Sequence, residues 1–151
     1  MITQAANAIA GSITPHQELS SDLKTLIADY ISDWDEEELE EVRRIRGQKR
    51  WYESESFKPE TEAMADLKNY MRRLEKSLLV LSELKERVDV GKIALENSEH
   101  GINVMFNLPS EPQPGSAFVI VDDDLEVSED RLAEQIAGWI ENDSESGWEE
   151  L

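Results

Sequence analysis

The chain has 151 residues and a formal net charge of −19, from 34 acidic and 15 basic side chains. This length suits one domain that buries roughly two thirds of the surface of the unfolded chain. The charge repels phosphate and anionic lipid, which argues against direct binding to nucleic acid or to a membrane. Without cysteine, the chain has no disulfide and no thiolate nucleophile or metal ligand.

The beginning of the chain has no basic residue before its short apolar stretch, so it does not resemble a signal peptide. No apolar run reaches the roughly 20 residues that a membrane span needs. These two features, together with the missing cysteine, lead us to expect a cytoplasmic protein.

Helical spacing dominates residues 14–90, after a segment at 1–13 that we expect to be a flexible N-terminus. The sequence Thr14-Pro15-His16-Gln17 has the residues of a capping box. Apolar residues then recur every three or four positions from Leu19 to Trp34. Asp35 with Glu38 is a second capping signal, which predicts a break near residues 32–35 and a second helix to about residue 50.

A heptad-like seam follows the connector at residues 51–58 and a helix restart at Pro59. Its apolar positions, from Met64 to Val88, are spaced by three and four residues with one slip. A helix of about 30 residues would be roughly 45 Å long. Such a helix either packs along the earlier helices or forms a homodimer or partner-binding coiled coil through residues 64–88.

The pattern changes to that of β-strands after Gly91. Two strands are predicted at residues 92–96 and 102–108, joined by a hairpin loop at 97–101. A second loop is predicted at residues 109–115, which contain three prolines. The run at 117–121 is continuously apolar, which is typical of a central or doubly covered strand.

The end of the chain is predicted to form one helix followed by a tail. Ser128 can cap a helix in which Leu132, Ile136, Trp139 and Ile140 share a face, with Trp139 in the core. Residues 142–151 are predicted to be an acidic, disordered tail.

These patterns together predict an α+β fold. An N-terminal helical hairpin or bundle of two to three helices comes first, then a three-stranded antiparallel meander and a C-terminal helix. We expect residues 91–141 to form one domain with the helices; the alternative is two subdomains with Gly91 as the hinge.

Few residues could carry catalysis. Asp122, Asp123 and Asp124 directly follow the apolar strand, and Asp122 and Asp124 would point to one side of a continued strand, where they could hold Mg²⁺. The two histidines, His16 and His100, lie in no metal-ligand spacing, and no nucleophile elbow or phosphate-binding glycine loop occurs. We therefore expect no enzyme, no cofactor and no metal, and we interpret the aspartates as a solvated turn.

One stretch is basic: Arg43, Arg44, Arg46, Lys49 and Arg50, followed by Trp51 and Tyr52. Basic and aromatic residues together can grip a nucleic-acid backbone and stack bases. Five acidic residues precede this stretch in the same predicted helix. We therefore expect the arginines to pair with these neighbours and to offset the helix C-terminus.

Acidic residues are unevenly distributed. Residues 122–151 hold 12 acidic side chains and one basic side chain, and a second acidic block covers residues 29–41 without a basic residue. Such blocks either only keep the protein soluble or form a surface that imitates the phosphates of nucleic acid. The second interpretation predicts these partner-binding residues: Asp29, Asp33, Glu37, Glu41, Asp122, Asp124 and Glu126.

The leading hypothesis is a non-enzymatic acidic protein-interaction module. It would bind and block a basic surface of a nucleic-acid-handling protein, as a nucleic-acid mimic that inhibits a nuclease or a defence system. The alternative is an acidic dimeric adaptor or chaperone-like protein that binds a client through its helical seam. A third hypothesis is a metal-dependent enzyme that uses Asp122 and Asp124.

Overall fold

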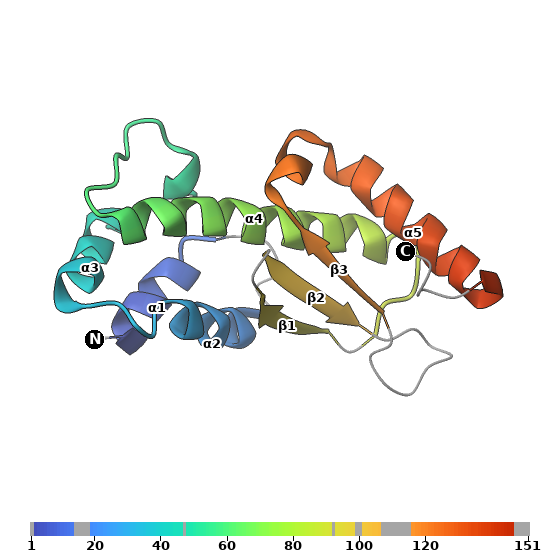
Figure 1. The fold of residues 1–151 in the computed structure, drawn as a ribbon, viewed down its shortest axis with the longest axis horizontal. Helices are drawn as coiled ribbons and strands as arrows, with labels where there is room; N and C mark the ends of the chain where they lie inside the picture. Colours follow the sequence, from blue (N-terminus) through green and yellow to red (C-terminus); the bar gives the residue numbers. More distant parts are fainter. Residues whose placement is uncertain are drawn as a thin grey trace. The chain divides into compact units, whose positions relative to one another are not determined.

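Within residues 2–13, 19–46, 48–91, 93–98, 101–106 and 116–146, the computed structural model contains five α-helices and a three-stranded sheet (Figure 1). Only the backbone is described for residues 141–146, Ser20, Ser116 and Asp122. Helices come first, an antiparallel meander follows and a helix ends the chain, so the predicted α+β fold is confirmed. The chain divides into two compact units, residues 1–75 and 76–151.

The first unit begins with helix α1 (Ile2–Ala10), which sequence analysis missed in favour of a flexible N-terminus. Alanine has the highest helix propensity, and here Ala5, Ala6 and Ile9 are also buried. Helix α2 (Ser20–Tyr30) has three buried residues on the predicted apolar face, namely Leu23, Leu26 and Ile27. The predicted cap at Thr14 lies outside the described residues.

Helix α3 (Glu36–Glu41) starts where the capping signal predicts. The Asp35 carboxylate accepts a hydrogen bond from the Glu38 N–H, and the Glu38 carboxylate accepts one from the Asp35 N–H, each at 2.8 Å. The predicted continuation to about residue 50 is wrong. A 3-10 turn, η2 (Val42–Ile45), follows α3, and Arg46 then adopts a left-handed conformation with φ 49°, which ends the helical path.

The connector contains a short 3-10 turn, η3 (Trp51–Glu53), whose aromatic residues belong to the core of the first unit. Trp51 and Tyr52 are 0% and 1% exposed. The Trp51 indole N–H donates to the Ser12 hydroxyl at 3.1 Å, and the Tyr52 hydroxyl donates to the Glu75 carboxylate at 2.7 Å. The connector is therefore held by side chains rather than by regular secondary structure.

Helix α4 (Glu62–Lys85) begins three residues after the predicted restart at Pro59. The Thr61 hydroxyl accepts a hydrogen bond from the Met64 N–H at 3.1 Å and so caps the helix. Seven seam residues are fully buried in the single chain: Met64, Leu67, Met71, Leu74, Leu78, Leu81 and Leu84. Val88, the last predicted seam residue, lies beyond the end of α4 and is half-buried. The seam within α4 is therefore covered by other residues of the same chain.

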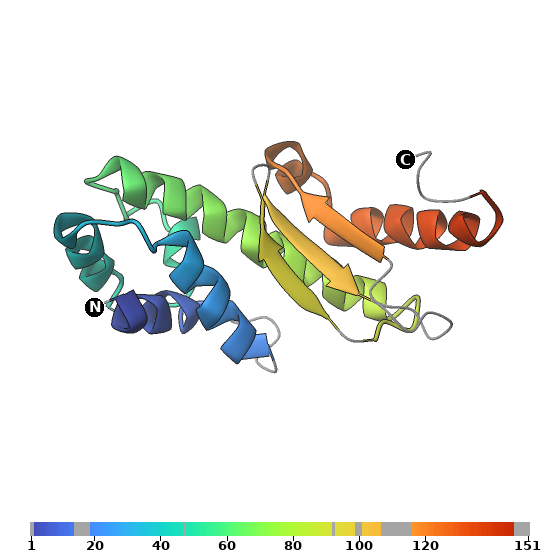
Figure 2. The same cartoon turned by 60° about the horizontal axis from the view of Figure 1, so that its bottom comes forward.

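The sheet of the second unit consists of β1 (Ala94–Asn97), β2 (Ile102–Phe106) and β3 (Ser116–Ile120), in the order β1-β2-β3 (Figure 2). Both strand pairs are antiparallel, with Leu95 opposite Val104 and Val104 opposite Phe118. Alternate residues of β2 and β3, such as Val104 and Phe118, are buried, so one face of the sheet forms the core.

The prediction of a central or doubly covered strand at 117–121 is wrong. β2 is the central strand, and β3 lies at an edge with Ala117 and Val121 exposed. A short apolar run does not distinguish a central strand from an edge strand whose second face is only partly covered.

Helix α5 (Glu129–Ser146) begins at the predicted cap, because the Ser128 hydroxyl accepts a hydrogen bond from the Arg131 N–H at 3.3 Å. It continues through residues 142–146, the first half of the predicted tail, and residues 147–151 lie outside the described part. Lys76 pairs with Glu129 at 3.2 Å, and Arg87 pairs with Asp130, so the start of α5 lies beside the end of α4.

The sequence pattern predicts that Trp139 lies in the core. This prediction is wrong, because the residue is 42% exposed. Leu132, Ile136 and Ile140 are buried, but Ala133 and Ala137 extend the buried face to the side away from Trp139. Among the described residues, no helix is apolar over a length sufficient to cross a bilayer.

Candidate functional site

The acidic block at residues 29–41 is divided by the turn between α2 and α3. α2 ends at Tyr30 and α3 begins at Glu36, so Asp33, Glu37 and Glu41 do not form one row on a continuous helix. Asp29 and Asp33 are exposed at the end of α2 and in the turn, and Glu37 is exposed in the first turn of α3. The block is therefore a cluster around a turn rather than a linear array of charges.

Glu41 is turned inward and does not belong to an exposed surface. Its side chain is 4% exposed and accepts hydrogen bonds from the Glu60 N–H at 2.7 Å and the Thr61 N–H at 2.9 Å. The Thr61 hydroxyl and the Arg44 guanidinium donate to it at 2.6 and 2.8 Å. Burial raises the pKa of Glu41, but these hydrogen bonds outweigh it and hold the pKa below its ordinary value.

These internal contacts separate Glu41 from the exposed carboxylates with which the prediction groups it, and its partner-binding role stays a prediction. The carboxylate joins the end of α3 to the residues that precede α4. Sequence analysis could not detect this role, because the hydrogen-bond donors at Glu60 and Thr61 lie about twenty residues away in the chain.

Three exposed acidic residues, Asp33, Glu62 and Asp66, lie at a hollow of about 440 Å³, whose full lining is Tyr30, Asp33, Trp34, Glu38, Glu62, Ala63 and Asp66. Helix α4 contributes two carboxylates, Glu62 and Asp66, which sequence analysis did not associate with the block at 29–41. The Tyr30 ring stacks on Tyr70, with ring centroids 3.9 Å apart. The hollow therefore combines acidic side chains with aromatic ones.

Two of these carboxylates lie close enough to the Tyr30 hydroxyl to affect its titration. Burial raises the pKa of Tyr30, as do the charges of Asp66 and Asp33, while Arg73 lowers it. In the described part of the chain, Asp33, Glu37, Glu62 and Asp66 form no ion pair. Their charges are thus available to a positively charged partner, and Tyr30 remains a neutral hydroxyl at physiological pH.

The second acidic cluster follows β3 in the 3-10 turn η4 (Asp122–Glu126). The Asp124 carboxylate accepts a hydrogen bond from the Val121 N–H at 3.0 Å, and the Asp124 N–H donates to the Val121 carbonyl at 2.9 Å. Asp123 and Glu126 are exposed. The side chain of Asp122, another predicted partner-binding residue, is outside the described part.

The turn η4 also changes the geometry expected for a metal site. The strand does not continue through Asp122 and Asp124, so the alternation that would align the two carboxylates is lost. Within the described residues, no three His, Cys, Asp or Glu side chains are grouped so that they could hold a metal ion. His16 and His100 lie outside those residues.

Four of the five basic residues of the basic stretch, all except Arg46, are engaged in contacts within the first unit. Arg50 binds the Glu75 carboxylate through two nitrogens at 2.8 and 2.9 Å, and the Arg44 guanidinium lies 4.7 Å from the centre of the Phe57 ring. Arg43 pairs with Glu40 at 2.8 Å, and Lys49 donates to the Gly11 carbonyl. Because Trp51 and Tyr52 are buried, they are unable to stack on bases.

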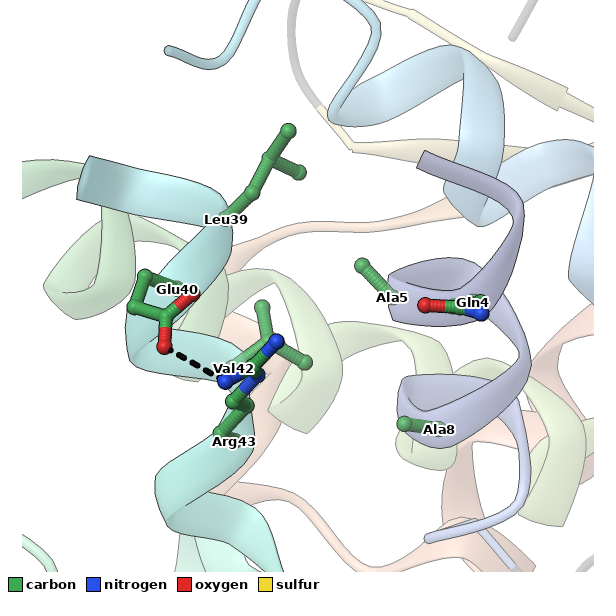
Figure 3. Close-up of a pocket in the computed structure, with 7 residues that line it drawn as sticks. All are labelled: Gln4, Ala5, Ala8, Leu39, Glu40, Val42 and Arg43. Atoms are coloured by element: carbon green, nitrogen blue, oxygen red, sulfur yellow. Dashed lines mark ion pairs between the residues drawn. The ribbon is translucent and has the colours of Figure 1, made fainter. Parts of the chain in front are cut away.

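A smaller hollow of about 110 Å³ lies between α1 and the segment α3–η2 (Figure 3). Ala5 and Ala8 face Leu39 and Val42 across it, and the Glu40–Arg43 ion pair stands at its side. Ligand pockets usually have volumes of roughly 300–1,000 Å³, so this space is too small for a substrate of ordinary size. We interpret it as a gap left by the small alanine side chains.

No family model, curated protein or solved structure matches the chain. The acidic-aromatic hollow of the first unit and the acidic turn of the second unit are the two candidate sites. Both present exposed carboxylates.

Proposed function

We propose that this chain is a non-enzymatic, acidic protein-interaction module that binds and blocks a basic surface of a partner protein. The partner would handle nucleic acid, and the exposed carboxylates would stand in for phosphates. One observation carries this proposal: Asp33, Glu37, Glu62 and Asp66 are exposed, and the described residues supply no ion-pair partner to any of them.

Clustering of like charges lowers the stability of the folded protein. Solubility alone does not require the charges to be clustered. Asp33, Glu62 and Asp66 line one hollow, where like charges repel each other and lower the stability of the folded state. The same chain pairs other carboxylates internally, such as Glu41 with Arg44 and Glu75 with Arg50. A partner that supplies arginine or lysine side chains would relieve the repulsion, and Trp34 and Tyr30 offer aromatic surface beside them.

The adaptor hypothesis receives less support. Its proposed interface, the seam of α4, consists of residues that are fully buried in the single chain. Dimerisation through this seam would require the helix to leave its present packing, at the expense of the core that it stabilises.

The experiment measures affinity for a purified nucleic-acid-binding protein, first isolated by affinity capture and then titrated at several ionic strengths. The test variant reverses three charges, Asp33→Lys, Glu37→Lys and Asp66→Lys. The matched control reverses three exposed charges elsewhere, Glu55→Lys, Glu86→Lys and Asp89→Lys. Exposed ion pairs are worth about 0.2–1 kcal/mol each, so the test variant should bind roughly thirtyfold more weakly, chiefly through slower association.

Duplex DNA should compete with the chain for the same partner, because both would occupy its nucleic-acid groove. The affinity should also fall steeply as salt rises. Affinity that is insensitive to salt, to DNA and to the test variant would refute the proposal, and the acidic residues would then serve solubility alone.

A further inference from the structure

The hydrogen-bond pattern of the sheet defines which backbone groups of β3 point outward. The Ser98 N–H donates to the Gly101 carbonyl at 2.9 Å, and hydrogen-bonded pairs alternate along an antiparallel ladder. Asn103 and Met105 therefore direct their backbone groups toward β1. Ile102, Val104 and Phe106 direct theirs toward β3, where their partners are Ile120, Phe118 and Ser116. The N–H and C=O groups of the intervening residues, Ala117 and Val119, point away from the sheet.

This outer edge is closed at one end and open along the rest. Val121, the next outward-pointing residue, exchanges hydrogen bonds with Asp124 through both its N–H and its carbonyl. Within the part of the chain that the structure describes, β3 pairs only with β2, and the outward groups of Ala117 and Val119 have no hydrogen-bond partner. The edge thus offers the backbone groups of two residues to an incoming strand.

The edge also lacks the usual protection against strand addition. Natural edge strands carry charged side chains, prolines or bulges that prevent pairing with other chains. The β3 sequence Ser-Ala-Phe-Val-Ile has none of these, whereas the opposite edge strand, β1, carries the exposed Glu96. Ala117 is exposed and Val119 is half-buried, so the side chains beside the open backbone groups are apolar and accessible.

Charge indicates which strand the edge would accept. The exposed carboxylates of Asp123 and Glu126 lie in the turn that directly follows β3. The N-terminal residues of a strand added antiparallel to β3 would reach this end of the edge. A second copy of the chain would bring another charge of −19 with it, so self-pairing is electrostatically unfavourable.

We propose that β3 accepts an extended segment of the basic partner as a fourth, antiparallel strand, with lysine or arginine at the N-terminal end of that segment beside the acidic turn η4. This inference rests on the proposed function, since it assumes a basic partner, and it adds the mode of binding. Main-chain hydrogen bonds would supply affinity, and the acidic turn would set the direction of the added strand.

Two synthetic peptides of identical composition test the direction. One has the sequence Lys-Lys-Val-Thr-Val-Thr-Val and the other Val-Thr-Val-Thr-Val-Lys-Lys, and their binding to the full chain is measured by fluorescence anisotropy. Two lysines near exposed carboxylates should favour the first peptide about fivefold. The double reversal Asp123→Lys with Glu126→Lys should abolish this preference, while the control pair Glu86→Lys with Glu134→Lys should preserve it.

Backbone variants test the edge itself. Ala117→Pro removes an outward N–H but no hydrogen bond to β2, so it should weaken the first peptide by about tenfold or more without unfolding the sheet. Leu95→Pro, at an outward position of the β1 edge, is the matched control. Val119→Lys places a protective charge on β3 and provides a second variant if the proline substitution reduces folding, which circular dichroism would show.

Equal affinity of the two peptides, or binding that survives both Ala117→Pro and Val119→Lys, would overturn this inference. So would a dimer in sedimentation experiments that Ala117→Pro dissociates, because the occupant of the edge would then be a second copy. The proposed function is tested separately, since the triple reversal at Asp33, Glu37 and Asp66 leaves β3 unchanged.

Discussion

Replacement of Glu41 by alanine should destabilise the protein although the residue belongs to a strongly acidic block. The carboxylate accepts hydrogen bonds from two backbone N–H groups, one hydroxyl and one guanidinium. Hydrogen bonds to charged groups contribute about 1.5–3 kcal/mol each, but water can reach some of the released donors. We therefore expect Glu41→Ala to lower the free energy of unfolding by about 3 kcal/mol.

Urea denaturation at neutral pH measures this loss, with Glu37→Ala as the matched control. Glu37 is exposed and has no ion pair among the described residues, so its removal should change the stability by less than about 0.5 kcal/mol. Two variants of equal stability would refute the assignment of Glu41 as a structural residue.

The same prediction has a pH dependence whose sign follows from the lowered pKa of Glu41. A carboxyl whose pKa is lower in the folded than in the unfolded protein stabilises the fold at pH values above its unfolded pKa. This contribution disappears as the pH falls through the folded pKa. The stability difference between the natural chain and Glu41→Gln should therefore be largest near neutral pH and decrease in acid. A difference that is constant down to acid pH would contradict the hydrogen-bonded, ionised carboxylate.

Two further predictions concern the core. Leu74 is fully buried in the seam of α4, so Leu74→Ala should lower the free energy of unfolding by roughly 2–4 kcal/mol in denaturant titrations. A loss below about 0.5 kcal/mol would mean that the seam is not packed. A Cβ atom at Gly101 would lie 2.6 Å from the Ile120 carbonyl oxygen, so Gly101→Ala should destabilise the protein by about 1–3 kcal/mol and lower its melting temperature. Gly138→Ala is the control: there is open space around Gly138, so this change should not lower the melting temperature.

Local signals explain why some elements could be predicted from the sequence. The capping residues Asp35, Glu38 and Ser128 act on backbone groups three positions away, so their effect is visible in the sequence. The seam of α4 was detectable because its period extends over many turns. By contrast, α1 is stabilised by burial of small alanines, and alanine-rich stretches lack the contrast between apolar and polar positions on which detection depends.

The candidate sites depended on contacts that the sequence does not reveal. The hollow in the first unit combines Asp33 with Glu62 and Asp66, which come from an element thirty residues later. Glu41 has the same local surroundings as its acidic neighbours, yet Glu60 and Thr61 draw it inward. The open edge of β3 follows from strand order, and an apolar run such as residues 117–121 does not report whether it has one neighbour or two.

The turn that leads into the connector illustrates how an irregular segment can become a separate unit of motion. Arg46 and Arg50 both hold left-handed backbone conformations, which non-glycine residues adopt only at a cost. Glu75 holds the Arg50 end of this segment, and among the described residues it accepts the hydrogen bonds of both the Arg50 and the Tyr52 side chains. Loss of that one carboxylate would remove the bonds of both side chains at once. We expect the turn around Arg50 to open locally more often as a result, while the Trp51 indole keeps its bond to Ser12 and the neighbouring helices stay folded.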